Sequence, residues 1–403
     1  MNDAILVLNA GSSSLKFAVY PYAPGSPPPI LRGKIAGIGT NPVFSVRKSV
    51  GVAVPQASPM PLQPSAGLDD LIPKLLDWLN SNRGGVTIRV AGHRVVHGGR
   101  THAEPARVTD VLLTDLETLV PLAPLHQPHN LTAIRCVAAS DPGLPQVACF
   151  DTSFHRTQSR LSQLFALPRA MTEEGIVRYG FHGLSYDYIA GALPTHLGGR
   201  ADGRVIVAHL GSGASMCAMK DRRSVATSMG FTALDGLMMS RRCGALDPGL
   251  VLYLMQEKGL TAQDVTSLLY TKSGLLGVSG ISNDMAALEA NASATAREAI
   301  DLFCYRAAGE LARLATAIGG LDAIVFTAGI GENSALVRRL ICDRLLWMGV
   351  EIDRRANDRH ATRIGSLNSE VDVLVIPTDE EIIVARATHA LTSAKSAPTR
   401  LKP

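Results

Sequence analysis

The sequence predicts an α/β protein built from two related domains, and three features of the chain lead to this prediction. A length of 403 residues exceeds the ~250 to 300 residues at which one hydrophobic core usually stops growing. Short apolar strand patterns alternate with helical patterns, and polar loops follow several strands. A turn rich in hydrogen-bond donors follows a strand once in each half, at 11–14 and 211–215. Ligands of such folds bind at strand ends, so we expect an active-site cleft between the domains.

Local patterns predict the elements that carry the polar loops. Residues 4–8 and 15–20 are typical of two strands joined by a tight polar turn. Apolar residues at helical spacing predict a helix over 68–79, in which Pro73 would delay the start or cause a kink. A long amphipathic helix is expected over 296–318. It leads into a strand, a glycine turn and a second helix, which is the usual setting for a nucleotide at a helix N-terminus.

Composition and charge exclude several classes of protein. Apolar residues make up 46% and charged residues 18% of the chain, which favours a globular protein over a disordered one. The net charge of +4 is spread along the chain without dense basic runs, so we expect neither nucleic acid nor membrane as a partner. The six cysteines form no CxxC pair, and no secretion signal or membrane span is recognisable. We therefore expect a cytoplasmic protein.

Two turns have the composition of an anion-binding loop. Glycine lets backbone N–H groups approach an anion closely, and serine adds a hydroxyl donor. The turns at 9–14 and 211–215 combine both residue types, and a glycine turn at 329–332 follows a predicted strand. Two such loops can bind a polyphosphate together. Each loop alone also has the composition of an ordinary turn.

Three cationic side chains are candidates for binding phosphate. Lys16 lies just beyond the first turn, and Arg94 and Arg242 lie in glycine-containing loops. Guanidinium groups can stabilise the charge of a transferring phosphoryl group. The alternatives are an edge lysine and surface arginines.

Histidines and carboxylates add further candidates. His126 and His182 stand near proline or glycine. They are either hydrogen-bond donors to a phosphate or carboxylate ligand, or structural histidines. The spacing of the histidines does not support a zinc site. Asp151 and Glu380 each follow an apolar strand pattern. Such a pair suits Mg²⁺, which prefers one or two protein carboxylates together with water and phosphate oxygens. The alternative is that each residue is structural, because a single Asp at a strand end is more often a turn former or a helix cap.

Taken in order, the motifs resemble the acetate kinase family of the acetate and sugar kinase, Hsp70 and actin superfamily. The resemblance runs from Leu6 to about Arg386. The matching segments are LVLNAGSSSLKF, GHRVVHGG, LAPLHQPHN, FDTSFH, RYGFHG, HLGSGAS, TSMGFTALDGL, LLGVSGIS, FTAGIGENS and PTDEE. The resemblance implies two ribonuclease H-like domains. It assigns the acyl substrate to 1–150 with a C-terminal helix, 381–403, packing back on it, and the nucleotide to 151–380.

The resemblance also implies an activity, which is Mg²⁺-dependent transfer of a phosphoryl group between ATP and acetate, with Mn²⁺ as a substitute ion. Asn9 and Glu380 would hold the metal, and Asp151 would organise the metal and the arginines. Arg94 and Arg242 would bind substrate and the transferring phosphoryl group, with His182 as a donor and His126 in support. The nucleotide would contact Lys16, Ser12, Ser14, His209, Leu210, Gly211, Ser212, Gly213, Asp284, Gly329, Ile330, Gly331, Glu332 and Asn333. A homodimer is what the family implies.

The family's acyl pocket maps onto Val96, Leu125, Phe181 and Ala233. Ala233 stands where the family usually has proline, and a smaller wall would admit one more carbon, so we expect propionate to be accepted unusually well. Other positions also depart from the family pattern: Ser212, Ser240, Arg241, Ala245, Asp379, Tyr186 and Leu184. The alternative functions are therefore a propionate or other short-chain carboxylate kinase and, from another class, a nucleotide-binding regulator without catalysis.

Overall fold

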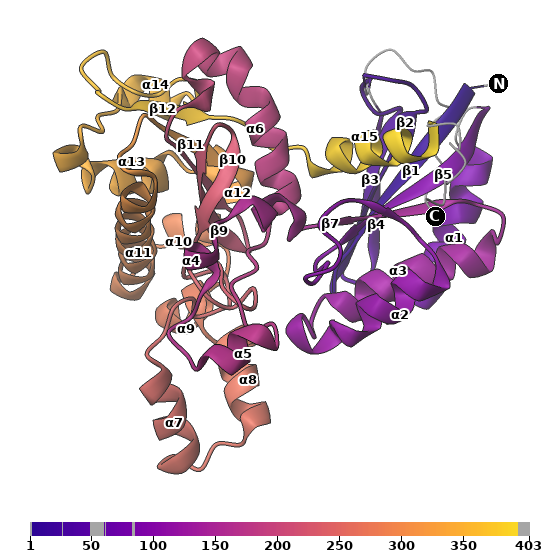
Figure 1. The fold of residues 1–403 in the computed structure, drawn as a ribbon, viewed down its shortest axis with the longest axis horizontal. Helices are drawn as coiled ribbons and strands as arrows, with labels where there is room; N and C mark the ends of the chain where they lie inside the picture. The colour runs from indigo at the N-terminus through magenta and orange to yellow at the C-terminus, as the bar shows by residue number, and fades with distance from the viewer. Residues whose placement is uncertain (1, 26, 49–59, 61, 83–84, 394–403) are drawn as a thin grey trace, which may run out of the picture. The chain divides into compact units, whose positions relative to one another are not determined.

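The computed structural model describes residues 2–25, 27–48, 60, 62–82 and 85–393. The chain forms two compact units (Figure 1). Unit 1 comprises Met1–Ser153 with Asp379–Pro403, and unit 2 comprises Phe154–Thr378. The assignment of the acyl substrate to 1–150 with 381–403, and of the nucleotide to 151–380, stays a prediction.

Within the described residues, unit 1 contains a seven-stranded sheet in the order β4-β3-β2-β1-β5-β7-β6. β1 and β2 form the predicted hairpin, closed by a hydrogen bond from Gly11 N to Ser14 O of 2.8 Å. β5 is parallel to β1, and β7 is parallel to β5, so their carboxyl ends lie at one edge of the sheet. The strands are β1 Asn2–Ala10, β2 Ser14–Pro21, β3 Leu31–Ala36, β4 Val43–Lys48, β5 Val86–Val95, β6 Ala106–Arg107 and β7 Gln146–Phe150.

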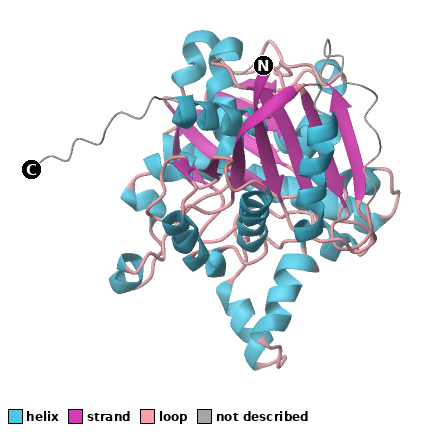
Figure 2. Cartoon of the chain, turned by 90° about the vertical axis from the view of Figure 1, so that its right-hand side faces the viewer, coloured by secondary structure: helices cyan, strands magenta, loops and turns pink. Residues whose placement is uncertain are grey.

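Helices cover both faces of the unit 1 sheet (Figure 2). α1, Leu68–Asn82, and α3, Gln127–Ser140, share a core with alternate residues of β1, because successive side chains of a strand point to opposite faces. α15, Glu380–Ser393, covers the other face, where a Cβ at Gly92 would lie 2.7 Å from Val384. α2, Asp110–Thr118, packs on α3. α1 begins at Leu68, so Pro73 lies inside this helix and does not delay its start.

Unit 2 contains a five-stranded sheet in the order β10-β9-β8-β11-β12 among its described residues. Its first three strands are antiparallel neighbours, and β11 and β12 are added in parallel. Five strands of unit 1, in the order β3-β2-β1-β5-β7, have the same sequence of antiparallel and parallel neighbours. The predicted relation between the two halves is therefore confirmed at the level of topology. The strands are β8 Val205–Leu210, β9 Ala214–Lys220, β10 Arg223–Thr227, β11 Ala323–Thr327 and β12 Asp372–Val375.

Two long helices enclose the unit 2 sheet. α6, Gly183–Leu197, shares a core with β8, β9, β11 and β12, and α11, Ala294–Ile318, packs on β8, β9 and β10. β8 is therefore buried along its whole length. α11 confirms the predicted long helix: Ser293 caps its N-terminus, and Gly319, with φ of 73°, ends it in the left-handed conformation.

Shorter helices complete unit 2, and two of them, α7 and α8, extend away from the rest of it in Figure 1. These helices are α4 Arg160–Gln163, α5 Arg169–Glu173, α7 Pro248–Gln256, α8 Ala262–Thr271, α9 Gly274–Ser279, α10 Met285–Glu289, α12 Ala328–Asn333, α13 Ala335–Asp343 and α14 Arg354–Asp358. None of the helices in the described parts of the chain is long and apolar enough to cross a bilayer.

Candidate active site

A buried ion pair lies at the carboxyl ends of β5 and β7 in unit 1. Asp151, which follows β7 and is 1% exposed, accepts from Arg94 of β5. Arg94 Nε lies 3.0 Å from Oδ1, and Nη2 lies 2.5 Å from Oδ2. Burial raises the pKa of the Asp151 carboxyl, and the charge of the bidentate guanidinium opposes that rise. Arg94 is thus held in one orientation by its partner carboxylate.

Asn9 and Glu380, the predicted metal ligands, lie around the same guanidinium. Asn9 Oδ1, at the end of β1, accepts from Arg94 Nη1 at 3.0 Å, and Glu380 Oε2, at the start of α15, lies 3.8 Å from Arg94 Nε. No group of three or more His, Cys, Asp or Glu side chains suited to a metal occurs among the described residues. One amide oxygen and one carboxylate do not form a dedicated cage. They do fit Mg²⁺, which keeps waters and takes its other ligands from substrate phosphates.

Asp379 is engaged away from these ligands. Its carboxylate pairs with Arg32 of β3, and its Oδ1 accepts from Ile382 N at 3.2 Å at the first turn of α15. Its charge is therefore compensated within unit 1. Beside it, burial raises the pKa of Glu381, and the charge of Lys16 opposes that rise. Lys16 is exposed on β2 and shares this neighbourhood with Glu381.

Two buried amide side chains of α3 hold the loop after β5, and the sequence analysis did not assign them a role. Asn130 Oδ1 accepts from Val96 N at 2.9 Å, and its Nδ2 donates to Ala10 O at 2.6 Å. Gln127 Oε1 accepts from His97 N at 3.2 Å, and its Nε2 donates to His97 O at 3.1 Å. Asn130 thus ties the ends of β1 and β5 together. The sequence analysis predicted no helix here, and the only available signal was two amide side chains three positions apart, a spacing that places them on one side of a helix.

In unit 2, His182 and Arg242 converge on the turn between β8 and β9. A Cβ at Gly213 would lie 2.7 Å from Arg242 Nη2 and 3.2 Å from His182 Nε2. Any side chain at position 213 would therefore occupy the place that both donors face. His182 precedes α6 with φ of 58°, a left-handed conformation that is uncommon for a non-glycine residue and occurs preferentially at functional sites.

Two buried hydroxyl groups, those of Ser215 and Tyr186, form a chain of contacts that ends at His182 Nδ1. Ser215 Oγ lies 2.8 Å from His182 Nδ1 and 2.5 Å from Tyr186 Oη. The His209 ring stacks on the His182 ring with centroids 4.2 Å apart, and His209 Nδ1 lies 2.8 Å from Ser185 Oγ. His209 therefore belongs to the support of His182. Tyr186 and Ser185 are supporting residues whose role the sequence analysis did not foresee.

Arg242 is oriented by the chain segment that carries Ala233. Its Nη1 donates to the main-chain carbonyl of Ala233. Phe181, directly before His182, is 1% exposed. The predicted wall residues thus fall in both units: Val96 and Leu125 in unit 1, and Phe181 and Ala233 in unit 2.

A cavity of about 290 Å³ in unit 2 brings together six of the residues predicted to bind nucleotide. These are Gly211, Ser212, Asp284, Gly329, Ile330 and Asn333. Six further residues line the cavity and were not predicted: Ser240, Asn283, Met285, Ala286, Glu289 and Ser334. Asp284 accepts from Ala287 N at 3.0 Å as the cap of α10. Ala328, with φ of 65°, turns the chain from β11 into α12 beside the cavity.

Three other residues that were predicted to bind the nucleotide do not line this cavity, namely Leu210, Gly331 and Glu332. Gly331 is buried against β8 and β11, and Glu332 Oε1 accepts from Ala328 N at 2.7 Å and from Thr378 N at 3.2 Å. Leu210 is fully buried at the end of β8. These residues shape the loops around the cavity and do not line it.

Arg338 of α13 supports the same loop and was missed by the sequence analysis. Its side chain is 0% exposed. Nη1 donates to the carbonyls of Gly331 and Glu332 at 2.9 Å each, and Nε donates to Asn357 Oδ1 at 2.8 Å. Burial lowers the pKa of this guanidinium. Nothing in the local sequence distinguishes it from the neighbouring Arg339.

The remaining predicted residues lie at the surface of unit 1. Ser12 is exposed and Ser14 is half-buried in the turn after β1. Leu125 is 38% exposed, and His126 is the half-buried cap residue of α3.

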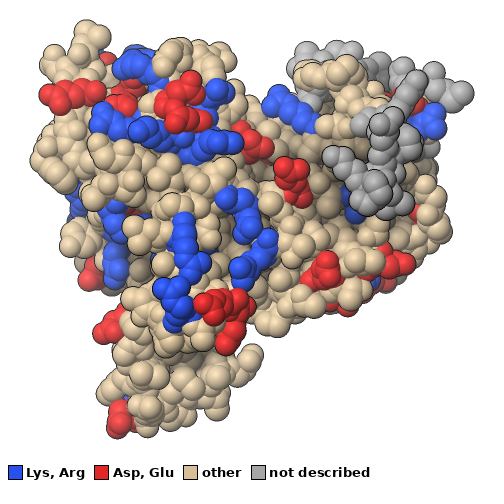
Figure 3. All heavy atoms as spheres, in the orientation of Figure 1, with Lys and Arg blue, Asp and Glu red and all other residues tan. Residues whose placement is uncertain are grey.

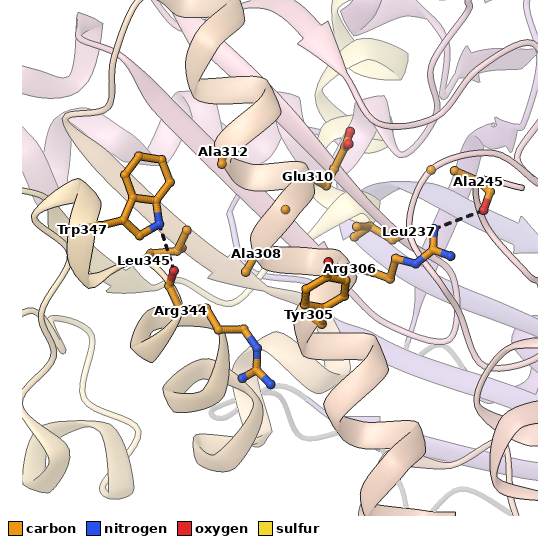
Figure 4. Close-up of a pocket in the computed structure, with 12 residues that line it drawn as sticks. Leu237, Ala245, Tyr305, Arg306, Ala308, Glu310, Ala312, Arg344, Leu345 and Trp347 are labelled. Atoms are coloured by element: carbon orange, nitrogen blue, oxygen red, sulfur yellow. Dashed lines mark hydrogen bonds between the residues drawn. The ribbon is translucent and has the colours of Figure 1, made fainter.

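A larger hollow of about 540 Å³ lies along α11 in unit 2 and contains none of the predicted residues (Figure 4). Two of its polar groups bond to the main chain: Trp347 Nε1 donates to Arg344 O at 3.1 Å, and Arg306 Nη1 to Ala245 O at 3.4 Å. Glu310 accepts from the side chain of Arg313. They do not converge on a common point as His182 and Arg242 do.

Fold and site define an α/β kinase of the actin, Hsp70 and sugar-kinase type. A propionate kinase from Francisella tularensis has a TM-score of 0.87 at 36% identity, with 96% of this chain and 99% of that chain covered. An acetate kinase from Porphyromonas gingivalis has a TM-score of 0.81 at 33% identity, with 96% and 99% covered. An acetate kinase from Rhodopseudomonas palustris is 51% identical over 96% of this chain and 98% of the relative. Residues 4–386 match the model of the acetokinase family, and the chain belongs to that family.

Proposed function

We propose that this chain transfers a phosphoryl group directly between ATP and acetate, giving acetyl phosphate and ADP, and that the reaction is reversible and depends on Mg²⁺. The observation that carries the proposal is the convergence of Arg242 Nη2 and His182 Nε2 over Gly213. Ser212, the neighbouring turn residue, lines the 290 Å³ cavity that we assign to the nucleotide. Two donors beside a nucleotide site suit a transferring phosphoryl group, whose charge lies on its equatorial oxygens.

The acceptor needs no general base. A carboxylic acid with a pKa near that of a glutamate side chain, ~4.3, is already ionised at neutral pH. The residues must then supply orientation and positive charge. Arg94, fixed by Asp151 and Asn9, is the cation of unit 1 that we assign to the acyl substrate.

Asn9 and Glu380 are the residues that we propose as protein ligands of Mg²⁺. When bound, the ion would neutralise charge on the phosphate oxygens. Asn9 Oδ1 accepts from Arg94, which fixes the orientation of the amide, and Glu380 supplies the carboxylate. Asp379 does not contribute a further charge, because Arg32 compensates it.

Acetate is the first candidate acceptor, and propionate is the second because of Ala233. The Rhodopseudomonas palustris relative is an acetate kinase, whereas the Francisella tularensis structure is of a propionate kinase. A methylene group in an apolar pocket changes binding by only about 1 to 3 kcal/mol, so both acids are expected to react.

A hydroxamate assay for acyl phosphate tests the proposal directly. ATP and Mg²⁺ are combined with acetate or propionate in parallel, and Arg242→Ala serves as the control. Acyl phosphate that forms with the native chain and is lost in the variant supports the proposal. Nucleotide binding without acyl phosphate from either acid would favour the regulatory alternative.

We also propose that the chain forms a homodimer through α7. Four large apolar side chains of this helix are exposed, namely Leu250, Leu252, Tyr253 and Met255 at 41%, 55%, 47% and 39%. Figure 3 shows the extension that carries them as mostly uncharged surface. Exposed apolar clusters mark interaction surfaces. Light scattering of the native chain and of Leu252→Glu tests this: we expect a dimer that the variant converts to a monomer, and a native monomer would refute it.

The cytoplasm is the compartment that we propose. No disulfide joins the six cysteines, which all lie in the described part of the chain, and four of them are buried. Free thiols without disulfides are typical of a reducing compartment. Fractionation of the cells that express the protein would test this.

A further inference from the structure

Tyr186, a position that departs from the family pattern, has its hydroxyl group next to the serine that contacts His182. The Tyr186 side chain is 0% exposed and belongs to the core cluster formed by α6 and the unit 2 sheet. Its Oη lies 2.5 Å from Ser215 Oγ, and burial raises the pKa of its phenol well above 10. The phenol therefore keeps its proton and requires an acceptor.

Ser215 Oγ is the partner that the structure places within hydrogen-bond distance of this hydroxyl. Ser215 is also 0% exposed, and its Oγ lies between Tyr186 Oη and His182 Nδ1, at 2.5 Å and 2.8 Å. A serine hydroxyl has one proton to donate. If Tyr186 donates to Ser215, the serine proton is free to go to His182 Nδ1. The reverse arrangement would leave the buried phenol proton without an acceptor, which is unfavourable.

The neighbouring histidines do not compete for the Tyr186 hydroxyl. The centroid of the His155 ring lies 5.6 Å from that of the Tyr186 ring. His155 Nε2 lies 2.9 Å from Phe181 O, and His155 Nδ1 lies 2.9 Å from Ser224 Oγ. A carbonyl only accepts, so His155 Nε2 carries a proton, and burial lowers the pKa of His155 to about 4, which keeps the ring neutral. Cys217 and His209 are also near Tyr186: burial raises the pKa of Cys217 to about 12, and the centroid of the His209 ring lies 6.4 Å from that of Tyr186. On the other side, His209 stacks on His182 with its Nδ1 2.8 Å from Ser185 Oγ.

We propose that Tyr186 and Ser215 form a hydrogen-bond relay that keeps His182 Nδ1 as an acceptor and places the ring proton on Nε2. Tyr186 Oη donates to Ser215 Oγ, and Ser215 Oγ donates to His182 Nδ1. His182 Nε2–H then faces the position over Gly213, next to Arg242 Nη2. Tyr186 is thus a positioning residue, since it acts through Ser215 on the donor that meets the phosphoryl group. This inference rests on the proposed function.

The relay has a consequence for the reaction. His182 offers an N–H to the phosphoryl oxygen in every turnover, without a proton having to be taken from solvent first. In the other tautomer, the Nε2 lone pair would face an anionic oxygen and repel it. A donor that is already aligned with the developing charge is the kind of group that lowers a barrier most.

Nitrogen-15 NMR of histidine-labelled protein tests the relay, because the two ring nitrogens of a neutral histidine differ strongly in chemical shift. The native chain, Tyr186→Phe and Tyr188→Phe are compared, with His182→Asn used to assign the His182 signal. Tyr188 is the matched control, because it lies on the same helix and loses the same hydroxyl group. We expect the Nε2–H tautomer alone in the native chain and in Tyr188→Phe, and a second population with the proton on Nδ1 in Tyr186→Phe.

Kinetics provides the second readout. We expect kcat of Tyr186→Phe to fall about two- to tenfold with KM for ATP changed less than about twofold, because the relay acts on the transition-state donor and not on nucleotide binding. Ser215→Ala should fall at least as far, and the double variant should be no worse than Ser215→Ala alone. Ser215→Ala also replaces the first variant if that one does not fold.

The outcomes separate the relay from the proposed function. A native His182 with its proton on Nδ1, or a Tyr186→Phe variant with the native tautomer, would overturn the relay. A full kcat in His182→Asn would overturn the assigned role of His182 and the kinetic part of the relay. The tautomer spectra need no turnover, so they still decide the hydrogen-bond relay itself.

Discussion

Arg242 donates a hydrogen bond from Nη1 to the main-chain carbonyl of Ala233. The guanidinium that we assign to the transferring phosphoryl group is thus anchored on the residue that we assign to the wall of the acyl pocket. A change of the Ala233 side chain leaves the carbonyl in place. Selectivity for the acyl group can therefore be varied without removing the anchor of Arg242.

Ala233→Pro is expected to reduce the use of propionate relative to acetate by about ten- to 200-fold, because the larger ring removes the room for one methylene group. The measurement is kcat/KM for both acids in the native chain and the variant. Ala233→Gly is the control, since it keeps the carbonyl and enlarges the pocket, and its ratio should not fall. A native propionate kcat/KM below about one percent of the acetate value would contradict the hypothesis.

Asp151→Asn is expected to lower kcat by about 10²- to 10³-fold, because Arg94 loses the carboxylate that fixes it. The guanidinium, whose side chain is 23% exposed, would keep only Glu380 at 3.8 Å as a charge partner, so the unfolding free energy should fall by less than the about 3–5 kcal/mol of a fully buried pair. Single-turnover kinetics and urea unfolding measure the two effects.

Asp322→Asn is the matched control for this pair. Asp322 also accepts two bonds from one guanidinium, that of Arg204, at 3.0 Å and 2.5 Å, but both side chains are about a third exposed. Exposed pairs contribute only about 0–1 kcal/mol, so kcat should be unchanged and stability nearly so. Equal losses in both variants would mean that Asp151 has no special role.

Arg338→Met is expected to raise the dissociation constant for ATP, because the carbonyls of Gly331 and Glu332 lose their buried donor and the loop beside the cavity relaxes. His360 Nδ1 lies 3.1 Å from Glu332 O and can still serve that carbonyl, whereas Gly331 O loses the donor that Arg338 supplies. A buried carbonyl left without a partner costs about 1–3 kcal/mol, and the free energy of unfolding should fall by about that amount. Calorimetry with ATP and urea unfolding are the measurements.

Arg339→Met controls for the loss of a guanidinium from α13. Arg339 lies next in the chain, and its Nη1 lies 3.6 Å from Asp343 Oδ2 at the surface. This variant should bind ATP like the native chain. An unchanged ATP affinity in Arg338→Met would refute the supporting role.

Acid should destabilise the protein between pH 6.5 and about 4 through its buried histidines. Burial lowers the pKa of His93, His97 and His155 from 6.5 to about 4. In this window the unfolded chain binds more protons than the folded chain, so stability is complete above pH 6.5 and decreases as the pH falls. Urea unfolding at several pH values measures the slope. His93→Gln should make it shallower, and an identical slope would contradict this account.

Local pattern in the sequence was sufficient for the elements that carry the site. The hairpin over 4–20, the long helix ending at Ile318 and the strand 323–327 are all present, whereas the predicted glycine turn at 329–332 is part of the short helix α12. Each of them depends on side-chain periodicity and on turn residues close together in the chain. The same holds for Gly211 and Gly329 of the cavity, because each follows a strand of one sheet, whereas Asp284 and Asn333 were predicted from the family resemblance alone.

Contacts between distant segments were not predictable in this way. The Asn130 bond to Ala10 joins residues 120 positions apart, and Asp379 pairs with Arg32 over 347 positions. Asp379 was flagged as a departure near the metal ligands, yet its charge is compensated. No pattern in the chain identifies such a partner.

The sequence by itself thus determined the fold class, the family and the strand ends where polar residues gather, because these follow from periodicity and from motifs that are contiguous in the chain. Only the tertiary structure decided which polar atoms meet: that Asp151 fixes Arg94, that Arg338 supports the loop after β11, and that Tyr186 reaches Ser215 behind His182. The reason is physical, since a buried donor must find its acceptor wherever packing places one, at any distance along the chain.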